Sequence, residues 1–386
     1  MKLSATNWSF GFEATVIKAL PLITQSGRND YTMYIVLAIL LFGILIATHE
    51  LGHFIAAKRL GVQVNEFAIG MGPKLFSRQR GETLYCLRLL PIGGACVMEG
   101  EDEDTMNPRA FTEQKRWKRI IILAAGSVVN FLFGLIVLLI IGMSVRYTVE
   151  TTLTSLAPGF PNEGADGLMA GDTIVSLNGN RLYYGEDFSL FIQLPDAQDG
   201  VVDLVIKRNG EKIKLPNFPL APAEYTENGS TLIRYGLNFT AAEVTFWGKI
   251  QYSFYKAINF ARIVRVSLVQ LFTGGAKLDD LSGPVGIVSS INEMAKDPEI
   301  ETTGERLIYV LSFGALIAIN LAVMNMLPIP ALDGGRIFGI AVTFVIEKIV
   351  RRRVNPKYEG YIHAAGLMVL LLLMAVVLVN DVIKLV

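Results

Sequence analysis

Charge, cysteine and histidine are all scarce in this 386-residue chain. Charged residues make up 18% of it, against roughly a quarter in soluble domains, and 52% are hydrophobic, which favours residence in a membrane. The 35 basic and 35 acidic residues balance, so no overall positive charge is available to bind nucleic acid. Two cysteines exclude a scaffold built on disulfides.

The first 32 residues lack the apolar core expected of a secretory signal peptide. Their longest apolar run, residues 14–24, is short and contains Lys18. Met33 stands directly before the first long apolar run. Residues 1–32 are therefore treated as an extension on which no functional prediction rests.

Four apolar runs are long enough to cross a bilayer, which takes about 20 residues. They cover residues 33–57, 120–145, 307–332 and 361–380. Basic residues gather at 115–119 and 351–353, in the loops before the second and fourth runs, and short basic loops stay in the cytoplasm. The sequence therefore predicts that these two loops are cytoplasmic and that residues 146–306 and both termini face outside.

The segments between the spans have patterns of their own. Residues 147–222 alternate apolar and polar and contain Asn-Gly turns, which predicts a small β-rich domain. Residues 244–272 are typical of a helix, and their four basic residues favour the membrane interface over a fifth crossing. On the cytoplasmic side, strand-like stretches at 65–75 and 83–90 predict a β-hairpin that dips toward the membrane.

One short motif, His49-Glu50-Leu51-Gly52-His53, contains candidate catalytic groups. Residues four apart on an α-helix point the same way, so the two imidazoles can hold one Zn²⁺. The Glu50 carboxylate can reach a water at the open position of such a metal and take its proton. Satisfied polar residues in a helical bundle are the alternative, but ionisable groups within a bilayer are costly and usually functional.

A catalytic zinc normally has three protein ligands, so a third must lie elsewhere in the chain. Position 59 is arginine, which excludes the extended motif with a nearby third histidine. Asp333 and His363 are the candidates. Asp333 follows a proline-rich break at the membrane face where the HELGH helix ends, although it could instead cap the next helix. A histidine at a span boundary, such as His363, more often packs than ligates.

Taken together, these motifs resemble the site-2 protease family, in its bacterial regulator-of-sigma-E protease branch. The resemblance extends over residues 33–386 and rests on HELGHF, on the segment from Asn325 to Leu332-Asp333-Gly334-Gly335, and on residues 67–75, 117–130 and 282–287. Ser127 departs from it, since many relatives have proline there.

The resemblance implies a set of functional residues. Zinc would be bound by His49, His53 and Asp333, with Glu50 as the catalytic base. Asn325 and Asn130 would line the substrate cleft, and the hairpin at 65–90 would receive the substrate as an added strand.

The implied fold class is an α+β membrane protein. It has a four-span helical core, a membrane-associated β-hairpin on the cytoplasmic side and an inserted extracytoplasmic PDZ-like domain. The predicted parts are the extension 1–32, spans one and two with the hairpin at 33–146, the PDZ-like domain at 147–240, an interfacial helix and linker at 241–306, and spans three and four at 307–386. Residues 167–179 carry the PDZ likeness; such a domain can bind a peptide C-terminus or act as a size filter.

The implied function is proteolysis in the bacterial plasma membrane, with the active site toward the cytoplasm. Substrates would be single-span proteins, such as anti-sigma factors or remnant signal peptides, and the other partner is the lipid bilayer.

Two other functions compete. A non-catalytic adaptor would not need zinc, and a metal transporter would need ionisable residues along a path. Cys86 and Cys96 fit no zinc-binding spacing and are assigned to packing.

Overall fold

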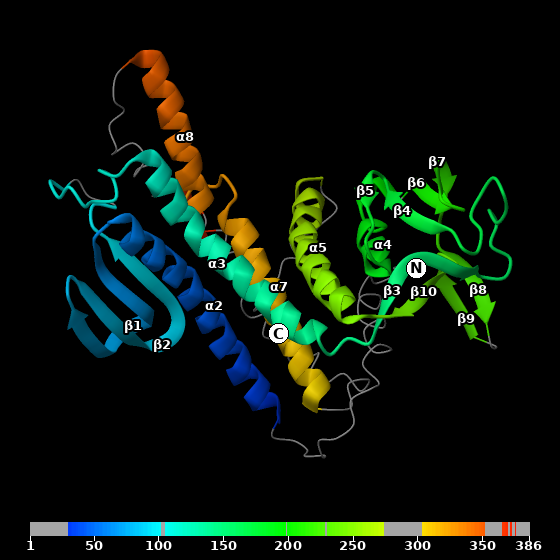
Figure 1. Ribbon diagram of the computed structural model, residues 1–386, viewed down its shortest axis with the longest axis horizontal. Helices are drawn as coiled ribbons and strands as arrows, with labels where there is room; N and C mark the ends of the chain where they lie inside the picture. The colour runs from blue at the N-terminus through cyan, green and yellow to red at the C-terminus, as the bar shows by residue number, and fades with distance from the viewer. Residues whose placement is uncertain are drawn as a thin grey trace. The chain divides into compact units, whose positions relative to one another are not determined.

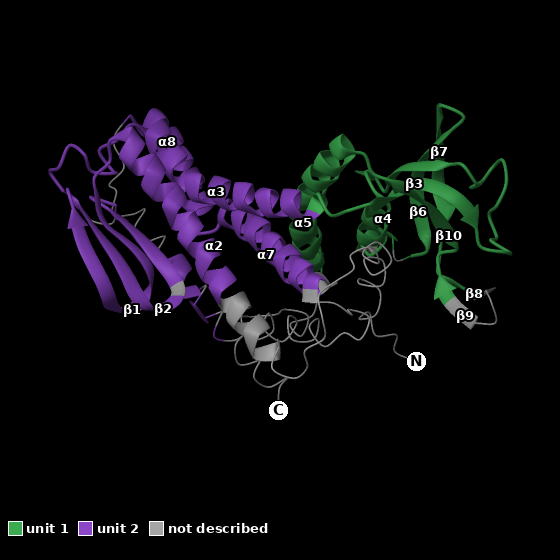
Figure 2. Cartoon of the chain, turned by 60° about the horizontal axis from the view of Figure 1, so that its bottom comes forward, with its two compact units in different colours: residues 1–21, 142–277 green, residues 22–141, 278–386 purple. Residues whose placement is uncertain are grey.

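The computed structural model describes residues 30–375, apart from 102–104, 198, 228–229, 274–302, 352–364, 370 and 373–374. The chain divides into two compact units (Figure 1, Figure 2). The helical unit comprises Leu22–Ile141 and Leu278–Val386, and the β-rich unit comprises Met1–Pro21 and Gly142–Lys277.

Three long apolar helices build the helical unit: α2 (Asp30–Leu60), α3 (Arg116–Gly142) and α7 (Thr303–Asn325). Within the described residues, these are the three helices long and apolar enough to cross a membrane. They coincide with the first three predicted spans. The fourth predicted span falls largely outside the described residues, although 365–369 are helical.

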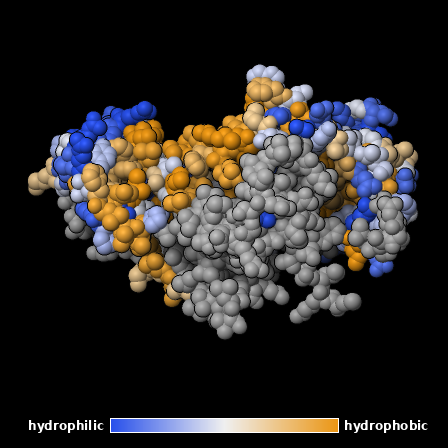
Figure 3. All heavy atoms as spheres, turned by 90° about the horizontal axis from the view of Figure 1, so that it is seen from below, coloured by the Kyte–Doolittle hydropathy of each residue, from blue (hydrophilic) through white to orange (hydrophobic). Residues whose placement is uncertain are grey.

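The outward faces of these helices are apolar. On α3, Leu132, Ile136 and Ile140 are about half exposed or more, at the i, i+4 spacing of one helix face. Figure 3 shows hydrophobic residues over much of the visible surface of this unit. Such a surface is unfavourable in water and suits a lipid environment.

The third span is shorter than predicted, and a further helix follows it. α7 ends at Asn325, and α8 (Asp333–Val350) occupies part of a segment predicted to be a loop. The glycines at 334–335 allow close packing where α8 begins. A Cβ at Gly334 would lie 2.3 Å from the carbonyl group of Met326, so only glycine fits at this turn.

The predicted hairpin forms from β1 (Val64–Arg80) and β2 (Thr83–Met98), which are both longer than expected. Each strand bends, so that the first half of β1 lies between the two halves of β2. Ile69 lies opposite Gly94 in the outer pairing. Among the described residues, 93–98 have no further strand partner and form an edge of this sheet.

A small buried core joins the parts of the helical unit that surround the HELGH motif. It contains Ala57 of α2, Val64 of β1, Ile122 of α3 and Ile340 of α8, each at most 1% exposed. These four elements are distant in sequence, so their common core fixes α8 and the sheet relative to the HELGH helix.

The β-rich unit confirms the predicted β-rich domain. Its main sheet has the strand order β10-β3-β4-β6-β7, with the short β5 on β4, and β8 and β9 form a separate pair. The bounds are β3 Tyr147–Leu156, β4 Thr173–Leu177, β5 Asn180–Arg181, β6 Val201–Arg208, β7 Glu211–Pro219, β8 Ala223–Glu227, β9 Ser230–Arg234 and β10 Leu237–Glu243. A short helix, α4 (Gly185–Phe191), contributes Phe188 and Phe191 to its core.

The predicted interfacial helix is α5 (Phe246–Thr273), which belongs to the same unit. Its four basic side chains all find partners there. Lys249 donates to the Met143 carbonyl, Lys256 pairs with Glu186, Arg262 pairs with Asp187, and Arg265 donates to Asn180. These charges therefore anchor α5 to its own unit.

Candidate metal centre and active site

Three predicted ligands converge at one point in the helical unit. Nε2 of His49 lies 3.2 Å from Oδ2 of Asp333, Nε2 of His53 lies 3.3 Å from it, and the two Nε2 atoms are 3.2 Å apart. Ligands of a tetrahedral zinc, about 2.0–2.2 Å from the metal, lie roughly 3.3 Å from one another. Asp333 Oδ2 is buried and accepts no hydrogen bond from the described residues, so this oxygen is free for a cation. The arrangement fits a metal ion.

Asp333 reaches this point because of the break between α7 and α8. It is the first residue of α8, whose N-cap is Leu332, so the alternative role of Asp333 as a helix cap is not what the structure shows. The other candidate ligand, His363, lies outside the described residues.

The second imidazole is held in the orientation that a ligand needs. His53 Nδ1 lies 2.8 Å from the backbone carbonyl of Ile122 on α3. A carbonyl accepts only, so Nδ1 carries the proton and Nε2 keeps its lone pair toward Asp333. Only 6% of His53 is exposed.

Glycines allow α3 to approach the HELGH helix closely. A Cβ at Gly52 would lie 2.5 Å from the Ala125 carbonyl oxygen, and a Cβ at Gly126 would lie 2.4 Å from His53 Nε2. Small residues at such crossings let two membrane helices pack backbone to backbone. The sequence alone did not predict this contact of Gly126 with the ligands.

Glu50 follows the ligand His49 on α2 and lies against the edge of the sheet. It is half-buried, and a Cβ at Gly94 would come within 3.0 Å of its Cγ. The strand that passes the predicted base is thus the stretch 93–98, which lies outside the predicted hairpin at 65–90. The sequence signal for this stretch is the Gly93-Gly94 pair, which closely follows the predicted hairpin.

Both predicted cleft asparagines contact His49, but at different nitrogens. Asn325 Nδ2 lies 3.3 Å from Nε2, and Asn325 is half-buried. Asn130 Nδ2 lies 3.5 Å from Nδ1, and Asn130 is 0% exposed. The structure thus leaves Asn130 no surface on which to contact a substrate. Thr48, which sequence reasoning missed, lies 3.0 Å from the amide of Asn130.

Neither cysteine joins this centre. Cys86 is buried, Cys96 lies on β2 opposite Phe67, and both are free thiols. Among the described residues, the one group of three metal-ligating side chains is His49, His53 and Asp333.

Comparison with known sequences agrees with this geometry. The sequence pattern of peptidase family M50 matches residues 37–373. The chain belongs to this family. A candidate zinc metalloprotease of Clostridium perfringens is 35% identical to this M50 chain over 353 residues, which cover 91% of the chain and 99% of the relative.

Two further relatives have names that specify an activity. Zinc metalloprotease RasP of Geobacillus kaustophilus is 29% identical, with 90% of this chain and 97% of the relative covered. Regulator of sigma-W protease RasP of Bacillus subtilis is 28% identical, with 89% and 97% covered. The M50 chain is a zinc metalloprotease, which confirms the predicted enzyme class and cofactor. Membership in a peptidase family also favours an enzyme over the adaptor and transporter alternatives.

Proposed function

We propose that this M50 protease hydrolyses peptide bonds within or beside the transmembrane helices of single-span membrane proteins, with zinc held by His49, His53 and Asp333. The observation that carries the proposal is the convergence of these three ligand atoms within 3.3 Å, with both histidines on α2, a helix apolar enough to cross a bilayer. When bound, the metal supplies a Lewis acid that polarises a carbonyl and acidifies water.

Glu50 is the general base in this proposal. It follows His49 directly on α2, and its half-buried carboxylate is next to the ligands without being one of them. It takes a proton from the attacking water onto a carboxylate oxygen and delivers that proton to the leaving amine nitrogen. A carboxylate in this role must stay uncoordinated, which agrees with its exclusion from the His-His-Asp group.

The edge stretch 93–98 is proposed to hold the substrate. A transmembrane helix hides its carbonyls in its own hydrogen bonds, so a substrate must unwind before it is cut. Pairing with an exposed strand edge would replace those bonds. Gly94 supports this role, because it has no side chain to keep a substrate backbone away from Glu50. Asn325, on the metal side of His49, is placed to donate a hydrogen bond to the substrate backbone.

The proposed location is a bacterial plasma membrane, with the active site toward the cytoplasm and the β-rich unit outside. The basic residues at 115–119 and 351–353 support this orientation.

The β-rich unit is proposed to be a PDZ-like domain. Its edge strand β10 contacts α4 through Phe239 and Phe188, whose rings are 5.5 Å apart, so a peptide added at that edge would lie beside α4. A domain that only excluded large substrates by size would not need an exposed strand edge beside α4.

The test is cleavage of a purified single-span substrate by the full chain in detergent. Glu50→Gln is expected to keep about one zinc per chain and to lower the cleavage rate about 100- to 10,000-fold. His49→Ala is expected to lose the metal. Glu113→Gln, at an exposed glutamate outside the site, is the matched control. Cleavage by Glu50→Gln at the control rate would overturn the assignment of the base.

A further inference from the structure

We propose that Asn130 and Thr48 form a hydrogen-bond relay that fixes the tautomer and orientation of His49. Asn130 is then a positioning residue for the metal centre and not a substrate contact. This inference rests on the zinc site of the proposed function. It begins with the burial of Asn130, which is 0% exposed on α3 and has its amide between the His49 ring and the Thr48 hydroxyl.

The relay follows from counting protons at Thr48. Its Oγ1 lies 2.9 Å from the backbone carbonyl oxygen of Leu45, an acceptor in position to take the single hydroxyl proton. Oγ1 also lies 3.0 Å from the Asn130 atom assigned as Oδ1, and the atom assigned as Nδ2 faces His49 Nδ1. A hydroxyl that donates to Leu45 can only accept from Asn130, and a His49 that binds metal through Nε2 carries its proton on Nδ1. Both contacts therefore require the Asn130 amide turned end for end, with its nitrogen toward Thr48. The two ends of an amide have the same shape, so contacts decide which is which.

The amide oxygen of Asn130 then faces His49. The end of the amide nearer to the ring lies 3.5 Å from Nδ1. As an acceptor, this oxygen requires the proton on Nδ1 and leaves the lone pair on Nε2, which points toward Asp333 and His53. The opposite amide orientation would place an N–H against Nδ1, move the ring proton to Nε2 and direct it into the metal position.

Both ligand histidines are thus held with the proton on Nδ1, but by different hydrogen-bond acceptors. His53 donates to a backbone carbonyl, at Ile122, which no side-chain substitution can remove. His49 depends on a side chain, at Asn130, and on the Thr48 hydroxyl that orients it. The metal centre is therefore vulnerable to substitution at Asn130 although this residue does not touch the metal position.

Asn325 provides an internal comparison. Its amide approaches the same ring at Nε2, 3.3 Å away, on the side where the metal lies. Two asparagines that contact one imidazole should therefore have separable effects. Loss of Asn130 should weaken metal binding, whereas loss of Asn325 should slow catalysis and leave metal binding intact.

The test is zinc affinity of the full chain in detergent, measured by competition with a chromophoric chelator. Loss of the hydrogen-bond partner of a ligand histidine typically lowers metal affinity about 10- to 100-fold, so Asn130→Leu is expected to raise the zinc Kd by that factor. Its cleavage rate should recover when zinc is in excess. Asn130→Asp keeps an acceptor for the Nδ1 proton and should rescue most of the affinity. Asn325→Leu should bind zinc like the wild type but cleave more slowly.

Two substitutions at Thr48 keep the proposal testable if a substitution at Asn130 prevents folding. Thr48→Val keeps the shape and removes the hydroxyl, so it should weaken zinc binding, whereas Thr48→Ser should restore it. Wild-type zinc affinity in folded Asn130→Leu or in Thr48→Val would overturn the relay. An equal loss in Asn130→Asp and Asn130→Leu, with both folded, would overturn the acceptor role. A wild-type chain that binds no zinc would instead refute the proposed function.

Discussion

Gly126 on α3 lies directly against the imidazole of His53, so that a Cβ added at this glycine would be 2.4 Å from Nε2. The same Cβ would lie 2.7 Å from Cε1 of His49. The surface of α3 is therefore one wall of the metal centre, and a single methyl group would displace both ligands.

Gly126→Ala is expected to weaken zinc binding at least about tenfold, because ligand geometry controls metal affinity. Zinc content of the purified chain checks this. Gly134→Ala is the matched control, because its Cβ would meet Ile319 Cγ1 at 2.8 Å, in contact with α7 and not with the ligands. Overpacking there should lower stability by about 1–3 kcal/mol without loss of metal. Equal zinc content in both variants would contradict the prediction.

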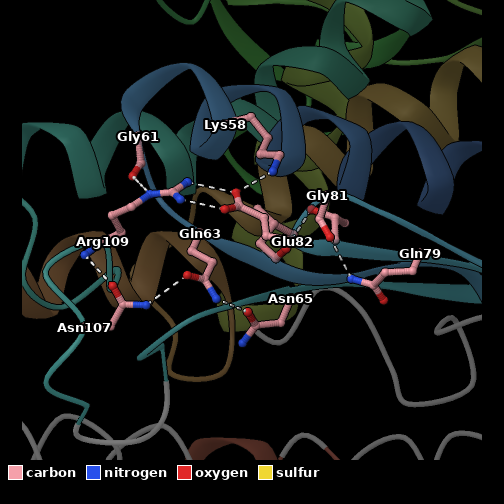
Figure 4. A network of polar contacts seen from close by, with 11 residues as sticks. Lys58, Gly61, Gln63, Asn65, Gln79, Gly81, Glu82, Asn107 and Arg109 are labelled. Carbon is pink, nitrogen blue, oxygen red and sulfur yellow. Dashed lines mark hydrogen bonds and ion pairs between the residues drawn. The ribbon is translucent and has the colours of Figure 1, made fainter.

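A second prediction concerns the turn of the β1–β2 hairpin, where Glu82 joins three elements (Figure 4). Its carboxylate lies 2.6 Å from Nζ of Lys58, at the end of α2, and accepts two hydrogen bonds from the guanidinium of Arg109. These hydrogen bonds, from Arg109 first and then Lys58, lower the pKa of Glu82 to about 2. The carboxylate is therefore ionised at every pH at which the protein is expected to function.

Glu82→Gln should destabilise the hairpin at neutral pH, by about 1 kcal/mol or less because Glu82 is partly exposed. The lowered pKa means that this stabilisation is present above the ordinary glutamate pKa and is lost as the pH falls toward 2. Thermal unfolding of wild type and Glu82→Gln should therefore differ at pH 7 and converge toward pH 2. A difference that is constant with pH would refute the electrostatic explanation.

A third prediction concerns the attachment of α5 to the β-rich unit. The guanidinium of Arg262 lies 4.7 Å from the ring centroid of Tyr183 and 5.2 Å from that of Phe191, and it pairs with the buried Asp187. Arg262→Ala removes both cation–π contacts and leaves Asp187 without its cation. The expected loss of stability is about 1–3 kcal/mol.

Pulse proteolysis of the full chain across a urea series measures this loss. Arg265→Ala is the control, because Arg265 is exposed and, among the described residues, donates only to Asn180, so its removal should cost within about 0.5 kcal/mol. If the two variants unfold at the same urea concentration, α5 is not held through Arg262.

The sequence by itself determined the pair His49 and His53, the three long apolar helices of the helical unit, and the β-rich character of residues 147–222. These features depend on local periodicity: residues four apart share a helix face whatever the rest of the chain does. The HELGH spacing therefore predicts a shared metal without knowledge of packing.

Tertiary structure alone decided how the rest of the site is arranged. It brought Asp333 within 3.3 Å of both histidines and set residues 93–98 beside Glu50. It also distinguished the two asparagines, because Asn130 contacts Nδ1 of His49 whereas Asn325 contacts Nε2. The physical reason is that these contacts join residues tens to hundreds of positions apart. Their geometry depends on how closely the helices pack, and at Gly126 the presence of a single Cβ would change it.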